Sequence, residues 1–215
     1  MNKKMTEVVF ILDRSGSMAG LESDTIGGFN SFVEKQRQEE GECLVSTVLF
    51  NQLSRVIHDR VPIDEIRNMN REDYFASGTT ALIDAMGDAI HHIKNVHKYI
   101  REEDVPANTV FVIITDGLEN ASHRYTSDQV KKMVSQQKEK GWEFLFLGAN
   151  IDAVETAKKY GIEEDRSVDF LNDTQGIKAN FKAVSKSVSS VRNMGRINEK
   201  WAKEIKEDYK KRKAD

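Results

Sequence analysis

The sequence predicts an α/β protein of the doubly wound type, in which helices cover both faces of a mostly parallel six-stranded sheet. Two observations carry this prediction. Short apolar runs alternate with helical patterns along the chain, and two successive runs are joined by only three residues. Parallel strands need a long crossover, usually a helix, whereas a short link makes neighbouring strands antiparallel. We therefore expect a three-layer fold with one antiparallel strand at the sheet edge.

The first part of the chain contains three of the predicted strands. Residues 8–12 are continuously apolar, which is typical of a strand buried on both faces. A helical pattern follows over residues 24–40. Residues 44–50 and 54–61 are the next strands, and the short link between them, residues 51–53, predicts the antiparallel edge strand.

The alternation continues along the rest of the chain. Predicted strands cover residues 110–115, 144–147 and 167–171, and predicted helices cover residues 81–100, 127–141 and 152–160. A last helix begins at Asp173 or Thr174, which both suit an N-cap position, and runs to about Met194. We expect one domain over residues 5–194.

Residues 195–215 are predicted to form a charged amphipathic helix beyond this domain. Ile197, Trp201, Ile205 and Tyr209 recur about every four residues, which places them on one stripe of a helix. The stripe either packs on the chain's own domain or docks a partner protein. Acidic residues interspersed among the basic ones argue against a membrane-bound helix.

The composition argues against several classes of function. A net charge of −3 over 215 residues is not typical of nucleic-acid binders or of polybasic membrane binders. Cys43 is the single cysteine, so no internal disulfide and no thiolate metal site can form. The N-terminal apolar run is too short for a signal peptide, and no run approaches the roughly 20 apolar residues of a transmembrane helix. We expect a cytoplasmic protein.

Three predicted loops carry oxygen-bearing side chains. Asp13-Arg14-Ser15-Gly16-Ser17 follows the first strand directly, Gly78-Thr79-Thr80 precedes a helix, and Thr115-Asp116-Gly117 ends the strand over residues 110–115. In an open parallel sheet, ligands bind beyond the carboxyl ends of the strands, where the strand order reverses. We expect the three loops to meet there. Carboxylates and hydroxyls suit a hard divalent cation, above all magnesium.

These loops resemble the motifs of the von Willebrand factor type A (vWA) domain, the integrin I-domain fold, with its metal-ion-dependent adhesion site (MIDAS). Residues Phe10–Met18 are similar to the family's D-x-S-x-S element, Gly78–Ala85 to its G-G-T-A-L-Y-D-A element, and Ile113–Gly117 to its T-D-G element. The three motifs occur in the family's order, and the resemblance covers about residues 5–190. It implies a Rossmann-like vWA fold.

The resemblance also implies a set of metal ligands. Ser15 and Ser17 would bind through their hydroxyls, and Asp13 and Asp116 directly or through water. The family's threonine aligns with Thr80; Thr79, which stands where the family often has glycine, is the alternative. The low charge of this set leaves the cation open to an acidic side chain from a partner. Mg²⁺ is expected, with Mn²⁺ or Ca²⁺ as alternatives.

The resemblance implies protein–protein interaction rather than catalysis. Intracellular family members often serve as adaptors or accessory subunits of larger machines, such as MoxR-type AAA+ ATPases, or accompany stress and tellurite-resistance systems. We therefore expect no enzymatic activity, no catalytic residues and no organic cofactor. The alternative is a magnesium-dependent, phosphatase-like hydrolase that uses Asp13, although Ser15 stands where such an enzyme needs a second carboxylate.

The remaining candidates are weaker. His91, His92 and His97 share a predicted helix, but their spacing puts no two rings on one face, so we expect exposed or half-buried side chains. Residues 119–124 follow the third loop and are expected at the rim of the site. Trp142 opens a strand and is expected in the core.

Overall fold

The structure is a computed structural model that describes the backbone of residues 2–213 and the side chains of residues 5–213. The described residues form a six-stranded sheet with the strand order β3-β2-β1-β4-β5-β6. The strands are β1 (Asn2–Asp13), β2 (Glu42–Phe50), β3 (Ser54–Pro62), β4 (Pro106–Thr115), β5 (Glu143–Gly148) and β6 (Ser167–Asp169). Only β3 is antiparallel to its neighbour, so the predicted fold class is confirmed.

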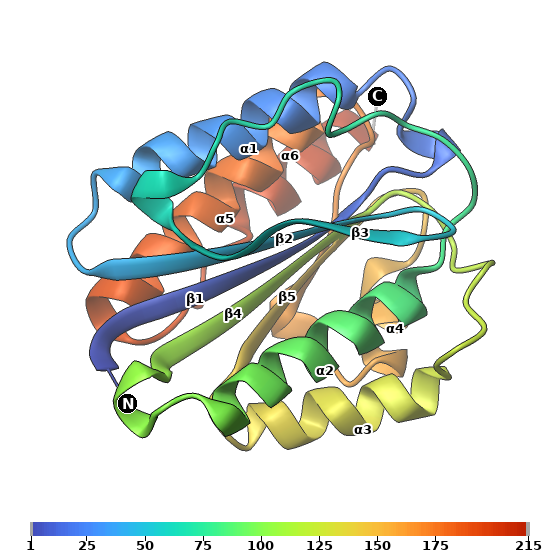
Figure 1. Cartoon of the computed structure of the whole chain (residues 1–215). Helices are drawn as coiled ribbons and strands as arrows, with labels where there is room; N and C mark the ends of the chain where they lie inside the picture. The colour runs from blue at the N-terminus through green and yellow to red at the C-terminus, as the bar shows by residue number, and fades with distance from the viewer. Residues whose placement is uncertain (1, 214–215) are drawn as a thin grey trace.

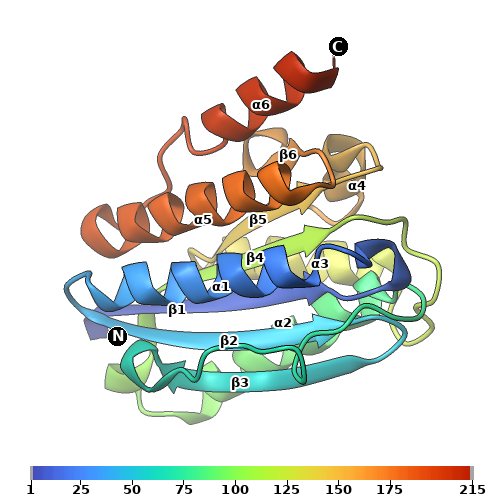
Figure 2. The same ribbon diagram turned by 90° about the horizontal axis from the view of Figure 1, so that it is seen from above.

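Helices cover both faces of the sheet (Figures 1 and 2). One side carries α1 (Glu22–Arg37), α5 (Thr174–Met194) and α6 (Lys203–Lys213), and the other carries α2 (Leu82–Tyr99), α3 (Ser127–Lys138) and α4 (Ala153–Lys159). Short 3₁₀ helices lie at Gly16–Met18, Ile63–Glu65, Glu102–Asp104 and Glu164–Arg166. The fold is therefore the predicted three-layer arrangement.

The core follows from the alternation of side chains along the strands. Phe10 of β1 points to the α1 and α5 side, where it meets Phe29 and Phe32 edge to face at 5.5 and 4.8 Å between ring centroids. Its neighbours Val9 and Ile11 point to the opposite side, toward α2 and α3. Because both faces are covered, residues 8–12 of β1 are apolar without alternation, and each of these buried side chains contributes about 1.5–3 kcal/mol.

The strand order reverses between β1 and β4. From β1 the chain passes through α1 to β2 on one side, and it reaches β4 through α2 on the other. The parallel register pairs Leu12 with Ile114, so Asp13 and Thr115 follow at the same edge. The first and third predicted loops therefore leave the sheet side by side, as expected for a ligand site at a switch point.

The C-terminal tail departs from the predicted continuous helix. Gly195 adopts a left-handed conformation (φ 70°) that ends α5, and turns occupy the segment before α6 begins at Lys203. Ile197, Trp201 and Ile205 are nevertheless buried in the core on the α1 and α5 side. The Trp201 indole N–H donates a hydrogen bond to the Asp165 carbonyl at 2.7 Å. The apolar stripe thus packs on the chain's own domain.

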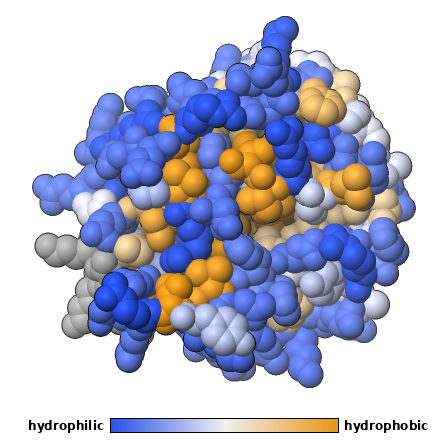
Figure 3. All heavy atoms as spheres, in the orientation of Figure 1, coloured by the Kyte–Doolittle hydropathy of each residue, from blue (hydrophilic) through white to orange (hydrophobic). Residues whose placement is uncertain are grey.

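Most of the surface visible in Figure 3 is hydrophilic, and apolar residues gather there in a few patches. Over residues 2–213, none of the helices is both long and apolar enough to span a bilayer. Cys43 is buried and carries a free thiol.

Candidate metal centre

The first loop begins with a carboxylate fixed by two neighbouring groups. Asp13, the last residue of β1, is buried. The backbone N–H of Ser15 donates to Asp13 Oδ1 at 2.7 Å, and the Thr115 hydroxyl donates to Asp13 Oδ2 at 2.6 Å. The Tyr74 hydroxyl donates to the carbonyl oxygen of Asp13. Hydrogen bonds to both the backbone and the side chain of Asp13 therefore fix the end of β1.

The two serines of the first loop lie between the two aspartates. Ser15 Oγ and Ser17 Oγ are 3.0 Å apart, and Ser17 Oγ donates to Asp116 Oδ1 at 2.6 Å. Ser15 is buried, whereas Ser17 is exposed. The exposed Ser17 therefore lies between the buried Ser15 and the buried Asp116, and a ligand can reach the row of oxygens from solvent at Ser17.

The second loop brings a third hydroxyl to the same place. The Gly16 N–H donates to the Gly78 carbonyl at 3.0 Å, which joins the first two loops. A Cβ on Gly117 would lie 3.5 Å from both Ser17 Oγ and Thr80 Oγ1, so these hydroxyls converge beside Gly117. Thr80 is buried and Thr79 is exposed. The structure thus brings the hydroxyls of Thr80 and Ser17 together at this glycine.

Glu119 and Asn120, expected at the rim, hold the second loop in place. The Thr80 N–H donates to Asn120 Oδ1, and the Asn120 N–H donates to the Thr80 carbonyl, both at 3.0 Å. Glu119 Oε2 accepts a hydrogen bond from the Ile83 N–H at 2.8 Å, in the first turn of α2. These residues therefore position Thr80 through backbone contacts.

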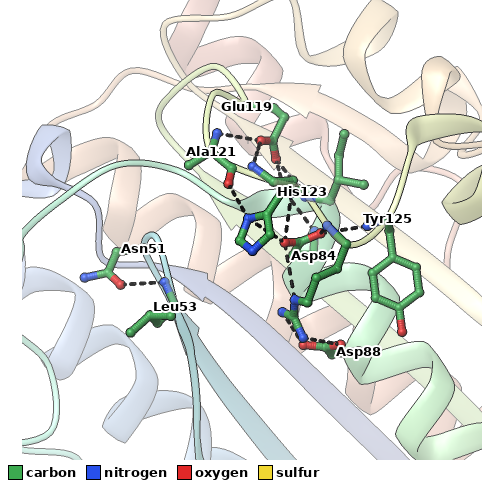
Figure 4. A network of polar contacts seen from close by, with 11 residues as sticks. Asn51, Leu53, Asp84, Asp88, Glu119, Ala121, His123 and Tyr125 are labelled. Carbon is green, nitrogen blue, oxygen red and sulfur yellow. Dashed lines mark hydrogen bonds and ion pairs between the residues drawn. The ribbon is translucent and has the colours of Figure 1, made fainter.

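Asp84, also in the first turn of α2, fixes the segment that follows the third loop (Figure 4). Its carboxylate accepts hydrogen bonds from the backbone N–H groups of His123, Arg124 and Tyr125 at 3.1, 2.9 and 2.9 Å. Burial alone would raise the pKa of Asp84, but these N–H groups and the Arg124 charge hold it below the ordinary value. A charged Asp84 therefore clamps the segment to α2.

Asn172 also supports the site, although only its place after a strand could have indicated it from the sequence. Its Nδ2 donates to Asp116 Oδ2 at 2.7 Å from the loop that follows β6. Both carboxylate oxygens of Asp116 thus accept a hydrogen bond, one from Ser17 in the first loop and one from Asn172 in the loop after β6. A lone asparagine after a three-residue strand carries no pattern that would single it out.

The two aspartates lack a cationic partner among the described side chains. Burial raises the pKa of Asp13, and the nearby charge of Asp116 raises it further, although hydrogen bonds from Ser15 and Thr115 lower it. Burial likewise raises the pKa of Asp116. The adjacent Arg14 lies over the Phe75 ring at 5.0 Å instead of pairing with either carboxylate. A bound cation would offset the cost of burying these charges.

The donor set fits a small hard cation. Octahedral Mg²⁺ binds oxygen at about 2.0–2.1 Å, which places neighbouring ligand oxygens about 3 Å apart. The separations of 3.0 and 2.6 Å along the row Ser15–Ser17–Asp116 are of this size. Within residues 5–213, no group of three or more His, Cys, Asp and Glu side chains is placed to hold a metal, so a metal site there depends on hydroxyl ligands. The histidines of α2 do not cluster: His92 contacts Asp59, and His97 contacts Glu7.

Solved structures share this fold. The vWF domain of the type V pili tip protein Mfa5 from Porphyromonas gingivalis matches with a TM-score of 0.64 and 11% identity, over 92% of this chain and 98% of that one. Proximal thread matrix protein 1 from the mussel byssus, solved with a zinc-occupied MIDAS motif, matches with a TM-score of 0.60 and 14% identity, over 87% of this chain. This chain covers only 46% of that protein.

The manganese-loaded TRAP protein of Plasmodium vivax also matches, with a TM-score of 0.55 and 14% identity over 84% of this chain and 73% of that one. At such low identity these likenesses establish the fold. No curated protein sequence matches the chain.

A comparison with protein families identifies residues 2–150 as a VWA domain containing CoxE-like protein. This match covers more than half of the 215 residues and includes all three loops of the candidate metal centre. It agrees with the resemblance that the three motifs indicated. The chain therefore belongs to the family of VWA domain containing CoxE-like proteins.

Proposed function

We propose that this protein binds a partner protein through a divalent cation at a MIDAS formed by Asp13, Ser15, Ser17, Thr80 and Asp116. The observation that carries the proposal is the convergence of hydroxyl and carboxylate oxygens from three loops, with separations of 3.0 and 2.6 Å along the row. A cation there would provide a positive centre that a partner's acidic side chain can ligate. Mg²⁺ is the ion we favour, because the spacing suits octahedral oxygen ligands.

Exposed apolar side chains on the same loops support a protein as the ligand. Leu53 follows the end of β2, Phe75 precedes the second loop, and Leu118 follows Gly117; they are 68%, 49% and 67% exposed. Single exposed apolar residues are common, but half of the six large exposed ones among residues 5–213 lie on the loops around the candidate site. Such residues would pack against a protein that places a carboxylate on the cation.

We infer binding rather than catalysis, with the chain as an adaptor or accessory subunit of a larger machine. Ser15 occupies the position where a phosphatase that uses Asp13 would need a second carboxylate. A MoxR-type AAA+ ATPase is the partner class we favour, on the strength of the family resemblance, and a stress or tellurite-resistance system is the other setting. The zinc and manganese named for two solved relatives support a divalent ion. The single cysteine supports a cytoplasmic setting.

Metal-dependent capture tests the proposal. The purified full chain, immobilised and incubated with lysate of its own source, should retain a partner with Mg²⁺ and release it with EDTA. Asp13→Asn and Ser15→Ala should abolish capture, whereas Thr79→Ala should retain it. Capture that survives both chelation and Asp13→Asn would exclude a metal bridge. Hydrolysis of phosphate esters that requires Mg²⁺ and Asp13 would favour the hydrolase instead.

A further inference from the structure

A pocket lies at the edge of the sheet opposite the candidate metal centre. Its volume is about 500 Å³, and it is bounded by the beginnings of β4 and β5 and the ends of α2 and α3. We call it the lysine pocket, and its defining residues are Lys94, Lys98, Thr109, Gln137, Lys140 and Trp142. Thr109 and Asp116 are seven positions apart, roughly 23 Å along a strand, so the two sites are separate. Small-molecule sites commonly have volumes of about 300–1,000 Å³.

Polar side chains without a hydrogen-bond partner among the described residues line the pocket. Thr109, Gln137 and Trp142 are only 2%, 1% and 8% exposed, and all three line the pocket. Over the described side chains, the Thr109 hydroxyl, the Gln137 side-chain amide and the Trp142 indole N–H make no hydrogen bond, and none of these polar atoms is fully buried. Because their residues line the pocket, a molecule bound there can offer them hydrogen bonds.

The charge of the pocket is positive. Lys94, Lys98 and Lys140 form no ion pair with the described residues, and no Asp or Glu is among the residues that line the pocket. The buried carboxylate of Glu7 is paired with Arg60 and with His97, which lines the pocket, each at 2.5 Å. Lysines near helix C-termini also complement helix dipoles, but that role does not explain the unpartnered groups beneath them.

Apolar surface completes the pocket. The Trp142 ring, which stacks on Phe111 at 5.3 Å, lines the pocket together with Val105 and Pro106. We propose that the lysine pocket binds a small organic anion, with its carboxylate, sulfonate or phosphate group near the lysines and an apolar or aromatic body against Trp142. This site is independent of the metal-dependent function proposed above.

Matched probes test the charge and the apolar body separately. Trp142 and Trp201 are the two tryptophans, so a Trp201→Phe background isolates the Trp142 fluorescence. 8-Anilinonaphthalene-1-sulfonate should quench it at a single site, and the uncharged N-phenyl-1-naphthylamine should bind at least tenfold more weakly. In the unaltered chain, the same sulfonate should shift the Trp142 indole N–H resonance.

Variants locate the site. Replacing Lys94, Lys98 and Lys140 together by Gln should weaken sulfonate binding at least tenfold, and Thr109→Val should weaken it several-fold. Lys132→Gln, at an exposed position on α3 outside the pocket, is the matched control and should have no effect. Equal binding of the two probes, unchanged binding in the triple variant, or no response of Trp142 would overturn the proposal. If inorganic phosphate competed for the pocket as tightly as the sulfonate binds, the proposed contact of an apolar body with Trp142 would be wrong.

Discussion

The substitution Asp13→Asn should stabilise the metal-free protein and abolish its response to metal. The amide keeps the shape of the side chain and removes its charge. Its oxygen can still accept from the Ser15 N–H, and its NH₂ group can donate to the Thr115 hydroxyl, which accepts as readily as it donates. The expected effects therefore come from the charge rather than from lost contacts.

The sign of the effect without metal follows from the raised pKa of Asp13. Burial is its main cause, and a charged carboxylate at this place costs stability. Because the pKa is raised on folding, protonated Asp13 contributes its full stability below the unfolded pKa of 3.8. This contribution to folding stability is lost as pH rises through the folded pKa. At pH 7 and without metal, the variant should therefore have a larger free energy of unfolding and a higher Tm than the wild type.

With metal bound, the wild type should become more stable than Asp13→Asn. A cation present at 100 times its Kd stabilises the folded wild type by about 2.7 kcal/mol, or roughly 5–11 °C in Tm. Thermal unfolding in EDTA and in excess MgCl₂, between pH 5 and 8, measures both effects. Asp128→Asn, an exposed position in the first turn of α3, is the matched control and should respond to Mg²⁺ like the wild type. An equal Mg²⁺ shift in Asp13→Asn and the wild type would refute the assignment of Asp13.

Three further substitutions test the surroundings of the site. Thr80→Ala should weaken Mg²⁺ binding about tenfold by calorimetry and Thr79→Ala should not; equal effects would contradict the choice of Thr80. Asp84→Asn should cost about 1–3 kcal/mol in urea unfolding at pH 7, because backbone N–H groups lose an ionised acceptor. Since the pKa of Asp84 is lowered, this difference in stability should shrink below pH 3.8 and vanish as pH falls through the lower folded value; a constant difference would argue against a charged Asp84. Trp201→Ala should cost about 3–5 kcal/mol in urea unfolding with Mg²⁺ affinity unchanged, and reduced affinity would link the tail to the metal.

The sheet was predictable because its determinants are local. The three-residue link after Phe50 leaves β3 no room to cross over, so its antiparallel pairing with β2 follows from chain length. The burial of β1 on both faces follows from its unbroken apolar run. The loops at Asp13 and Thr115 were predicted to meet because each follows such a run, and the Thr115–Asp13 hydrogen bond of 2.6 Å agrees.

The tail shows where periodicity is insufficient. Ile197, Trp201 and Ile205 are buried as their spacing indicated, but only Ile205 lies in α6. Gly195 ends α5, and the Trp201 N–H donates to the Asn198 carbonyl in a turn at 3.0 Å. A four-residue spacing fits a helix, and it also fits turns whose apolar side chains face the same core. Apolar residues alone do not separate these conformations.

The candidate site divides into atoms that the sequence identifies and atoms that it cannot. Groups that would touch the cation must be particular hydroxyls and carboxylates, so Ser15 and Asp116 stand in recognisable motifs. The segment that Asp84 holds contributes three backbone N–H groups, which every residue except proline carries, and the Arg124 side chain at 3.4 Å. The three N–H groups require no particular residue type, so they leave no pattern in the sequence. The motif identifies the acceptor, Asp84, whereas only the fold shows which backbone N–H groups it binds. Replacing Asp84 should therefore disturb this segment more than replacing His123.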